Sequence, residues 1–179
     1  MKILPKATFL LFSLLFLFYL ILPSPDFPEP LPGALTSKEP GDTETPLRKA
    51  YFTDLSREEI LTYYQNQFTN STFFGLPLPT YRLNYPPEEA QSLVRDQTRS
   101  TFLEEIVHPL RESLYMNGFE PKLDNEIIRE EGKKWRQKIT LRYVPSSPLI
   151  RLVFGVATLV LVYVLAKDVW GILQTFKRK

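Results

Sequence analysis

LVFGVATLVLVYVLA, residues 152–166, carries no charged side chain. Counted from Leu149, with Arg151 near its start, the apolar segment has 18 residues and reaches ~27 Å as a helix. That length is close to the ~30 Å hydrocarbon core of a bilayer. A helix of a soluble protein normally has a polar face, and this one has none. We therefore predict a transmembrane helix over residues 149–166.

The residues that follow, 167–179, predict an amphipathic, basic tail on the cytoplasmic side. Apolar side chains recur there at helical spacing beside Trp170, a pattern typical of a segment at the membrane interface. These side chains are Val169, Ile172, Leu173 and Phe176. The last three residues are Lys-Arg-Lys, and positive charge of this kind is retained in the cytoplasm.

The N-terminal segment has a basic start, residues 1–6, and an uncharged apolar run, residues 7–22. A signal anchor and a cleaved secretory signal peptide both begin this way. Because no A-x-A-like cleavage site precedes Pro23, we expect an uncleaved transmembrane anchor. The protein would then be a multi-pass protein of the cell membrane with both termini cytoplasmic. If the segment is cleaved, it would be single-pass.

Charge is distributed unevenly along the chain. Only one of the 20 acidic side chains lies outside residues 24–148, whereas seven of the 22 basic ones lie there, beside the apolar segments. This pattern indicates membrane topology and argues against a nucleic-acid partner. The chain contains no cysteine, which excludes disulfides, thiolate metal sites and cysteine nucleophiles.

Residues 23–47 hold seven of the 16 prolines among acidic and small polar residues. This composition predicts an extended, acidic, Pro-rich linker. The extracytoplasmic domain is expected at 48–145, starting with a strand at 50–53. Ser56 and Glu59 then form a capping box for a short helix, whose core face we predict to be Ile60, Leu61, Tyr64 and Phe68. Alternation over 81–85 predicts a strand.

Residues 86–117 predict the longest helix, which Pro109 should kink and Gly118 should end. Its core stripe would be Leu103, Ile106, Val107, Leu110 and Leu114. His108 follows Glu105 at the E-x-x-H spacing of di-iron bundles and lies four residues after Glu104, but a second such pair is impossible with one histidine. We therefore interpret His108 as a surface or helix-packing residue, and we predict no metal and no cofactor.

The last part of the domain predicts a hairpin. One arm is 125–129, the turn is Glu130 to Lys133, and the second arm, 134–143, alternates between apolar and basic residues. The expected fold class is α+β: a small antiparallel sheet with two helices packed on one face, flanked by N- and C-terminal transmembrane helices.

Four basic residues form the candidate contact site: Lys134, Arg136, Lys138 and Arg142. Alternation places them on the side of the strand opposite Trp135. The short connection to the membrane helix holds Arg142 within roughly 25 Å of the bilayer. Anionic lipids or an acidic partner would bind such a stripe. The alternative is a solvated face paired to Glu126 and Glu130.

No nucleophile elbow, zinc-protease motif or Gly-rich phosphate loop occurs in the sequence. The expected function is a membrane-anchored, non-enzymatic accessory, scaffold or sensory component of an envelope complex. Its partners would be membrane lipids and another membrane or envelope protein. The alternative is a membrane-tethered enzyme or ligand-binding protein that acts on a small extracytoplasmic molecule.

Overall fold

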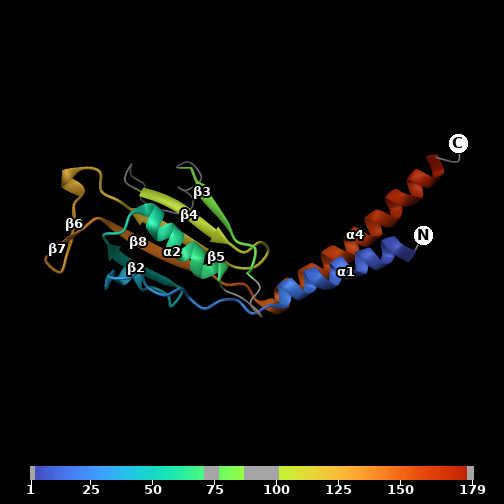
Figure 1. Ribbon diagram of the computed structural model, residues 1–179, viewed down its shortest axis with the longest axis horizontal. Helices are drawn as coiled ribbons and strands as arrows, with labels where there is room; N and C mark the ends of the chain where they lie inside the picture. Colours follow the sequence, from blue (N-terminus) through green and yellow to red (C-terminus); the bar gives the residue numbers. More distant parts are fainter. Residues whose placement is uncertain (1–2, 71–76, 87–100, 177–179) are drawn as a thin grey trace. The chain divides into compact units, whose positions relative to one another are not determined.

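The computed structural model describes residues 3–70, 77–86 and 101–176. They form two compact units: one runs from Pro25 to Pro145, and the other combines the chain up to Ser24 with the chain from Ser146. The first unit contains sheet and helix, so the predicted α+β class is confirmed (Figure 1).

The first unit is built on a six-stranded sheet in which all neighbouring strands are antiparallel. Across the sheet, the strands are β1 (Leu35–Thr36), β2 (Arg48–Thr53), β8 (Gln137–Val144), β5 (Ser113–Phe119), β4 (Thr101–Val107) and β3 (Tyr81–Tyr85). A separate hairpin joins β6 (Ile128–Glu130) to β7 (Lys133–Trp135). Two short 3₁₀ turns, η1 (Pro40–Asp42) and η2 (Asp124–Glu126), complete the described part.

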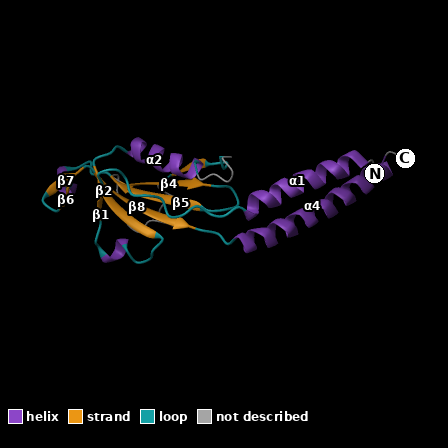
Figure 2. Ribbon diagram, turned by 60° about the horizontal axis from the view of Figure 1, so that its bottom comes forward, coloured by secondary structure: helices purple, strands orange, loops and turns teal. Residues whose placement is uncertain are grey.

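Helix α2 (Arg57–Thr69) lies across one face of the sheet (Figure 2). The predicted capping box is present. The Glu59 N–H donates to Ser56 Oγ, and the Ser56 N–H donates to the Glu59 carboxylate at 2.7 Å. The box satisfies donors at the first turn that would otherwise lack partners. Of the two helices expected on the sheet, α2 is the one that the described residues contain.

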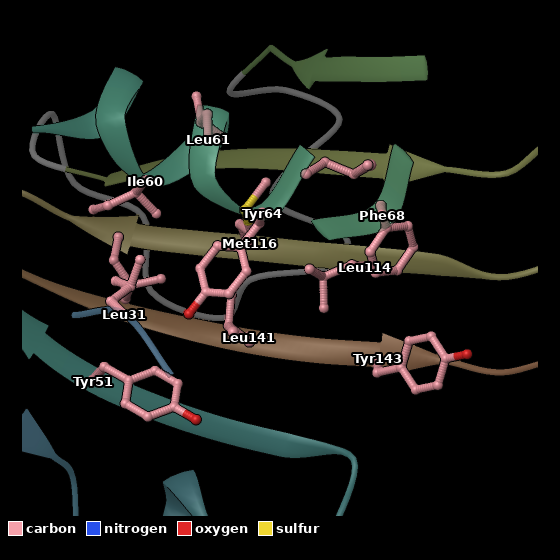
Figure 3. Packing of buried hydrophobic residues seen from close by; sticks show 12 residues of the cluster. Leu31, Tyr51, Ile60, Leu61, Tyr64, Phe68, Leu114, Met116, Leu141 and Tyr143 are labelled. Atoms are coloured by element: carbon pink, nitrogen blue, oxygen red, sulfur yellow. The ribbon is translucent and has the colours of Figure 1, made fainter. Parts of the chain in front are cut away.

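The hydrophobic core lies between α2 and the sheet (Figure 3). The predicted face of α2 is confirmed, since all four of its side chains are buried: Ile60, Leu61, Tyr64 and Phe68. They pack with Ile106 of β4, Leu114 and Met116 of β5, Ile139, Leu141 and Tyr143 of β8, and Tyr51 of β2.

The predicted linker is wrong for much of its length, because part of residues 23–47 packs on the domain. Leu31 is buried in the core, and the ring of Phe27 meets Tyr143 edge-on at 6.4 Å. Strand β1 then pairs with β2. Proline holds a chain extended but does not prevent its few apolar side chains from docking.

The predicted helix over 86–117 is also wrong where the structure describes it. Residues 101–119 form β4 and β5, joined by a turn, while 87–100 lie outside the described residues. Both faces of β4 are buried, so its apolar residues do not alternate as in a half-exposed strand. Glu104 is buried with them because Arg57 and Arg82 pair with it.

Two predictions for the turn between β4 and β5 are wrong. Leu110, expected in the core, is 70% exposed and has a left-handed backbone with φ 60°. His108, expected as a surface or helix-packing residue next to Glu104 and Glu105, is fully buried in the turn. Its Nδ1 lies 2.7 Å from Glu112 Oε1, and its Nε2 lies 3.1 Å from the Phe68 carbonyl oxygen.

These positions predict opposite outcomes for two leucines. Leu114→Ala should lower the free energy of unfolding by about 2–5 kcal/mol because it opens a cavity in the core. Leu110→Ala should change it by less than about 0.5 kcal/mol because the side chain faces water. Urea unfolding of the two variants checks this, and a large loss for Leu110→Ala would contradict the turn geometry.

The hairpin turn occurs where predicted, but the long second arm is two strands. Glu131 and Gly132 connect β6 to β7, with φ values of 50° and 76°. Positive φ at both positions is the geometry of a tight two-residue hairpin. The predicted strand is interrupted at Arg136, and β8 begins at Gln137 in the six-stranded sheet.

The second unit pairs α1 (Ile3–Ile21) with α4 (Pro148–Phe176). The helices lie side by side and antiparallel, with the N-terminal end of α1 and the C-terminal end of α4 at the same end of the pair (Figures 1 and 2). Helix α4 is long and apolar enough to cross a membrane. It continues without a break through Lys167 and Asp168, so it includes the predicted span and most of the predicted tail. The apolar part of α1, Lys6–Ile21, is shorter.

Candidate functional site

The four predicted contact residues do not form one stripe. Lys134 lies on β7, and Arg136 lies at the break between β7 and β8. Lys138 and Arg142 lie on β8, on the face away from the buried Ile139 and Leu141. The alternation is therefore confirmed within β8, while the break separates the other two residues.

Lys138 holds the N-terminal segment of the domain on the sheet. Its Nζ donates to Asp42 at 2.7 Å and to Glu39 at 2.8 Å, and the Ser37 hydroxyl donates to Asp42 at 2.6 Å. Burial by itself lowers the pKa of Lys138, but the hydrogen bonds and charges of Asp42 and Glu39 outweigh it, so the pKa is raised. These contacts assign Lys138 a structural role, with partners other than the expected Glu126 and Glu130.

Arg142 belongs to a polar row on the sheet face opposite α2. In register across the strands lie Glu105, Tyr115, Arg142 and Arg48. The Tyr85 hydroxyl donates to Glu105. Burial, reinforced by Glu105, raises the pKa of Tyr85. Sequence reasoning missed this row because it assigned Glu105 to a helix.

Lys134 and Arg136 line a pocket of about 420 Å³ beside the β6–β7 hairpin. The pocket combines apolar and charged side chains. Its other lining residues are Asp54, Pro121, Lys122, Leu123, Asp124, Ile127 and Trp135. The sequence predicted two of these residues as contacts. The rest come from the segment between β5 and β6, from Asp54 after β2 and from Trp135 of β7, and no local pattern links them.

Polar contacts connect the residues on the hairpin side of the pocket. Asp54 accepts from Lys133 Nζ at 2.6 Å and from the Arg136 N–H at 3.2 Å. The hydrogen bond from Lys133 is the main cause that lowers the pKa of Asp54. Arg136 Nε donates to Glu120 at 2.8 Å. Lys133 Nζ also sits 3.8 Å above the ring of Trp135.

The hairpin also carries an uncompensated pair of cations. Lys134 of β7 lies directly opposite Arg129 of β6, and both residues are exposed. Neither one belongs to a salt bridge within the described ranges. Like charges in opposing positions repel, so an anionic group bound between them would stabilise the hairpin. This pair, with the adjoining pocket, is the strongest candidate for a binding site on the domain.

Nowhere in residues 3–70, 77–86 and 101–176 do three His, Asp or Glu side chains converge as metal ligands would. His108 is enclosed by Glu112 and the end of α2, away from the pocket-lining residues.

Comparison with protein-family models, with curated proteins and with solved structures finds no match to this chain.

Proposed function

We propose that this protein is a membrane-anchored, non-enzymatic interaction protein. Helices α1 and α4 both cross the cell membrane, α1 as an uncleaved anchor, and both termini lie in the cytoplasm. The unit from Pro25 to Pro145 lies outside the cytoplasm and serves as an accessory, scaffold or sensory part of an envelope complex.

The observation that carries the two-helix anchor is the position of Arg151. This residue lies in the first turn of α4 and is 5% exposed. Its Nη2 donates to the Leu22 carbonyl oxygen at 3.1 Å and to the Ser24 hydroxyl at 3.3 Å. An arginine at the edge of an apolar span needs such partners. Cleavage after residue 22 would remove the first of them.

The packing next to Arg151 supports the same proposal. Gly155 lies one turn further along α4, where an added Cβ would clash with Leu20 of α1. Further along, the rings of Phe9 and Tyr163 are 6.0 Å apart. Small residues that let two helices approach closely are typical of membrane helix pairs.

We assign the partner contact to the hairpin site of Arg129, Lys134 and the adjoining pocket. Its cations and the apolar side chains of Leu123 and Ile127 suit an acidic segment of another membrane or envelope protein. Anionic lipid headgroups are the other source of negative charge. The pocket volume of about 420 Å³ also lies in the range of small-molecule sites, which favours a ligand-binding protein as the second candidate.

Single-cysteine variants test the topology and the partner together, since the chain has no cysteine of its own. Intact cells that produce Asp124→Cys, an exposed position that lines the pocket but leaves both cations in place, are treated with a membrane-impermeant maleimide carrying a photo-crosslinker. We expect labelling, followed on illumination by a crosslink to another protein. Thr175→Cys on α4 should react only after the cells are permeabilised.

Leu110→Cys is the matched control for the contact, because it is exposed on the same unit but outside the pocket. It should label equally and yield no protein crosslink. Labelling of Thr175→Cys in intact cells would overturn the topology. Crosslinking of Asp124→Cys to lipid alone, or equal adducts from both sites, would overturn the protein-partner assignment.

A further inference from the structure

Strand β3 forms one edge of the six-stranded sheet. Among the described residues, β4 is the only strand that pairs with it. The opposite edge is β1, which has only two residues. An edge strand presents N–H and C=O groups that another strand can bind, and a short edge limits such pairing. The five residues of β3 therefore make it the better edge for adding a strand.

The side chains of β3 leave this edge open. Tyr81 is 58% exposed and Leu83 is 46% exposed. Proline residues flank the strand at Pro79 and Pro86 but do not interrupt it. The one charged residue, Arg82, is directed to the α2 side: its Nε donates to Glu104 at 2.8 Å. Its charge is thus compensated within the chain and does not repel an approaching strand.

The sequence of β3, YRLNY, is nearly symmetric about Leu83. Antiparallel pairing with a second copy, centred on Leu83, places Tyr81 opposite Tyr85 of that copy and Arg82 opposite its Asn84. Leu83 then lies opposite Leu83. Aromatic residues in opposing positions stabilise an antiparallel pair. Centring on Arg82 instead would oppose two arginines, so charge favours the register centred on Leu83.

We propose that two copies of this protein associate through β3, with antiparallel pairing centred on Leu83 that joins their sheets into one. The interface is isologous, as in most homodimers. The pairing is short, and anchoring in a membrane, as proposed above, raises the local concentration that sustains it.

Disulfide trapping tests the register in the full chain reconstituted in lipid vesicles. The Cα atoms of two opposing residues lie about 4.5–5.5 Å apart, within reach of a disulfide. Leu83→Cys should therefore form a covalent dimer under mild oxidation. Tyr81→Cys alone should not, because two such residues are offset by about 13 Å along the strands. A mixture of Tyr81→Cys and Tyr85→Cys should form the mixed dimer.

Leu110→Cys is the control for random collision, since that position is more exposed than Leu83. If Leu83→Cys crosslinks no faster than Leu110→Cys, the proposal is overturned. Crosslinking of Tyr81→Cys alone at the rate of Leu83→Cys would overturn the register. Both outcomes leave the anchor untouched, because labelling of Asp124→Cys and Thr175→Cys in cells reports on it separately.

A second variant tests the interface without a covalent bond. Leu83→Lys places two like charges at the centre of the pairing and should reduce the dimer fraction at least tenfold, as measured by energy transfer between fluorescently labelled copies of the full chain in lipid vesicles. Circular dichroism should be unchanged, because Leu83 is half-exposed. Leu110→Lys makes the same change in an exposed turn and should dimerise normally. A dimer that persists in Leu83→Lys would assign association to another surface and overturn the proposal.

Discussion

A fragment of residues 46–145 is expected to be less stable than residues 25–145 by about 3–5 kcal/mol. The shorter fragment lacks Leu31, which is 3% exposed within the core cluster. Loss of one such side chain costs about 2–5 kcal/mol. It also lacks Glu39 and Asp42, which would leave the half-buried Lys138 without its two carboxylate partners.

Urea unfolding measures the difference, and Trp135 is then the only tryptophan that reports. Within residues 25–145, Leu31→Ala should reproduce much of the loss. Glu44→Ala is the control, because that side chain is 66% exposed and should change stability by less than about 0.5 kcal/mol. Equal stability of the two fragments would show that the docked N-terminal segment contributes nothing.

His108→Ala is expected to lower the free energy of unfolding by about 3–5 kcal/mol. The imidazole is fully buried and contacts the Glu112 carboxylate on one side and the Phe68 carbonyl on the other. Its removal takes one partner from each of these buried acceptors, and the Glu112 carboxylate, which Arg111 also contacts, is fully buried. Breaking a buried charged or polar pair on one side costs about this much.

The same urea titration checks His108→Ala, with Leu110→Ala as its control two residues away in the same turn. A loss below about 1 kcal/mol would contradict the structure, because it would mean that His108 is solvated. The contact with Phe68 also ties the β4–β5 turn to the C-terminal end of α2. Hydrogen exchange should therefore accelerate at the end of α2 in His108→Ala, and not in the control.

Features that depend on neighbouring residues could be predicted from the sequence. The capping box needs only Ser56 and Glu59, three residues apart, and the core face of α2 follows from helical spacing. The two-residue hairpin follows from Glu131 and Gly132. The C-terminal apolar helix follows from the absence of charge over residues 152–166. Each of these patterns is local, and nothing distant in the chain opposes it.

Contacts between distant residues decided the rest. The sequence alone places Glu104 on a helix. In the structure it lies in the sheet, where Arg57 and Arg82, 47 and 22 residues away, compensate its charge. Leu31 and Asp42 were predicted as linker residues. In the structure Leu31 packs in the core, and Asp42 forms a salt bridge with Lys138. The basic residues of the last predicted strand were expected to form one stripe. The strand is interrupted at Arg136, so Lys134 lies in a separate hairpin. A charge is buried at low cost, and a strand is stable, only when the partner residue or strand is present. That partner is distant in the sequence, so local patterns cannot identify it.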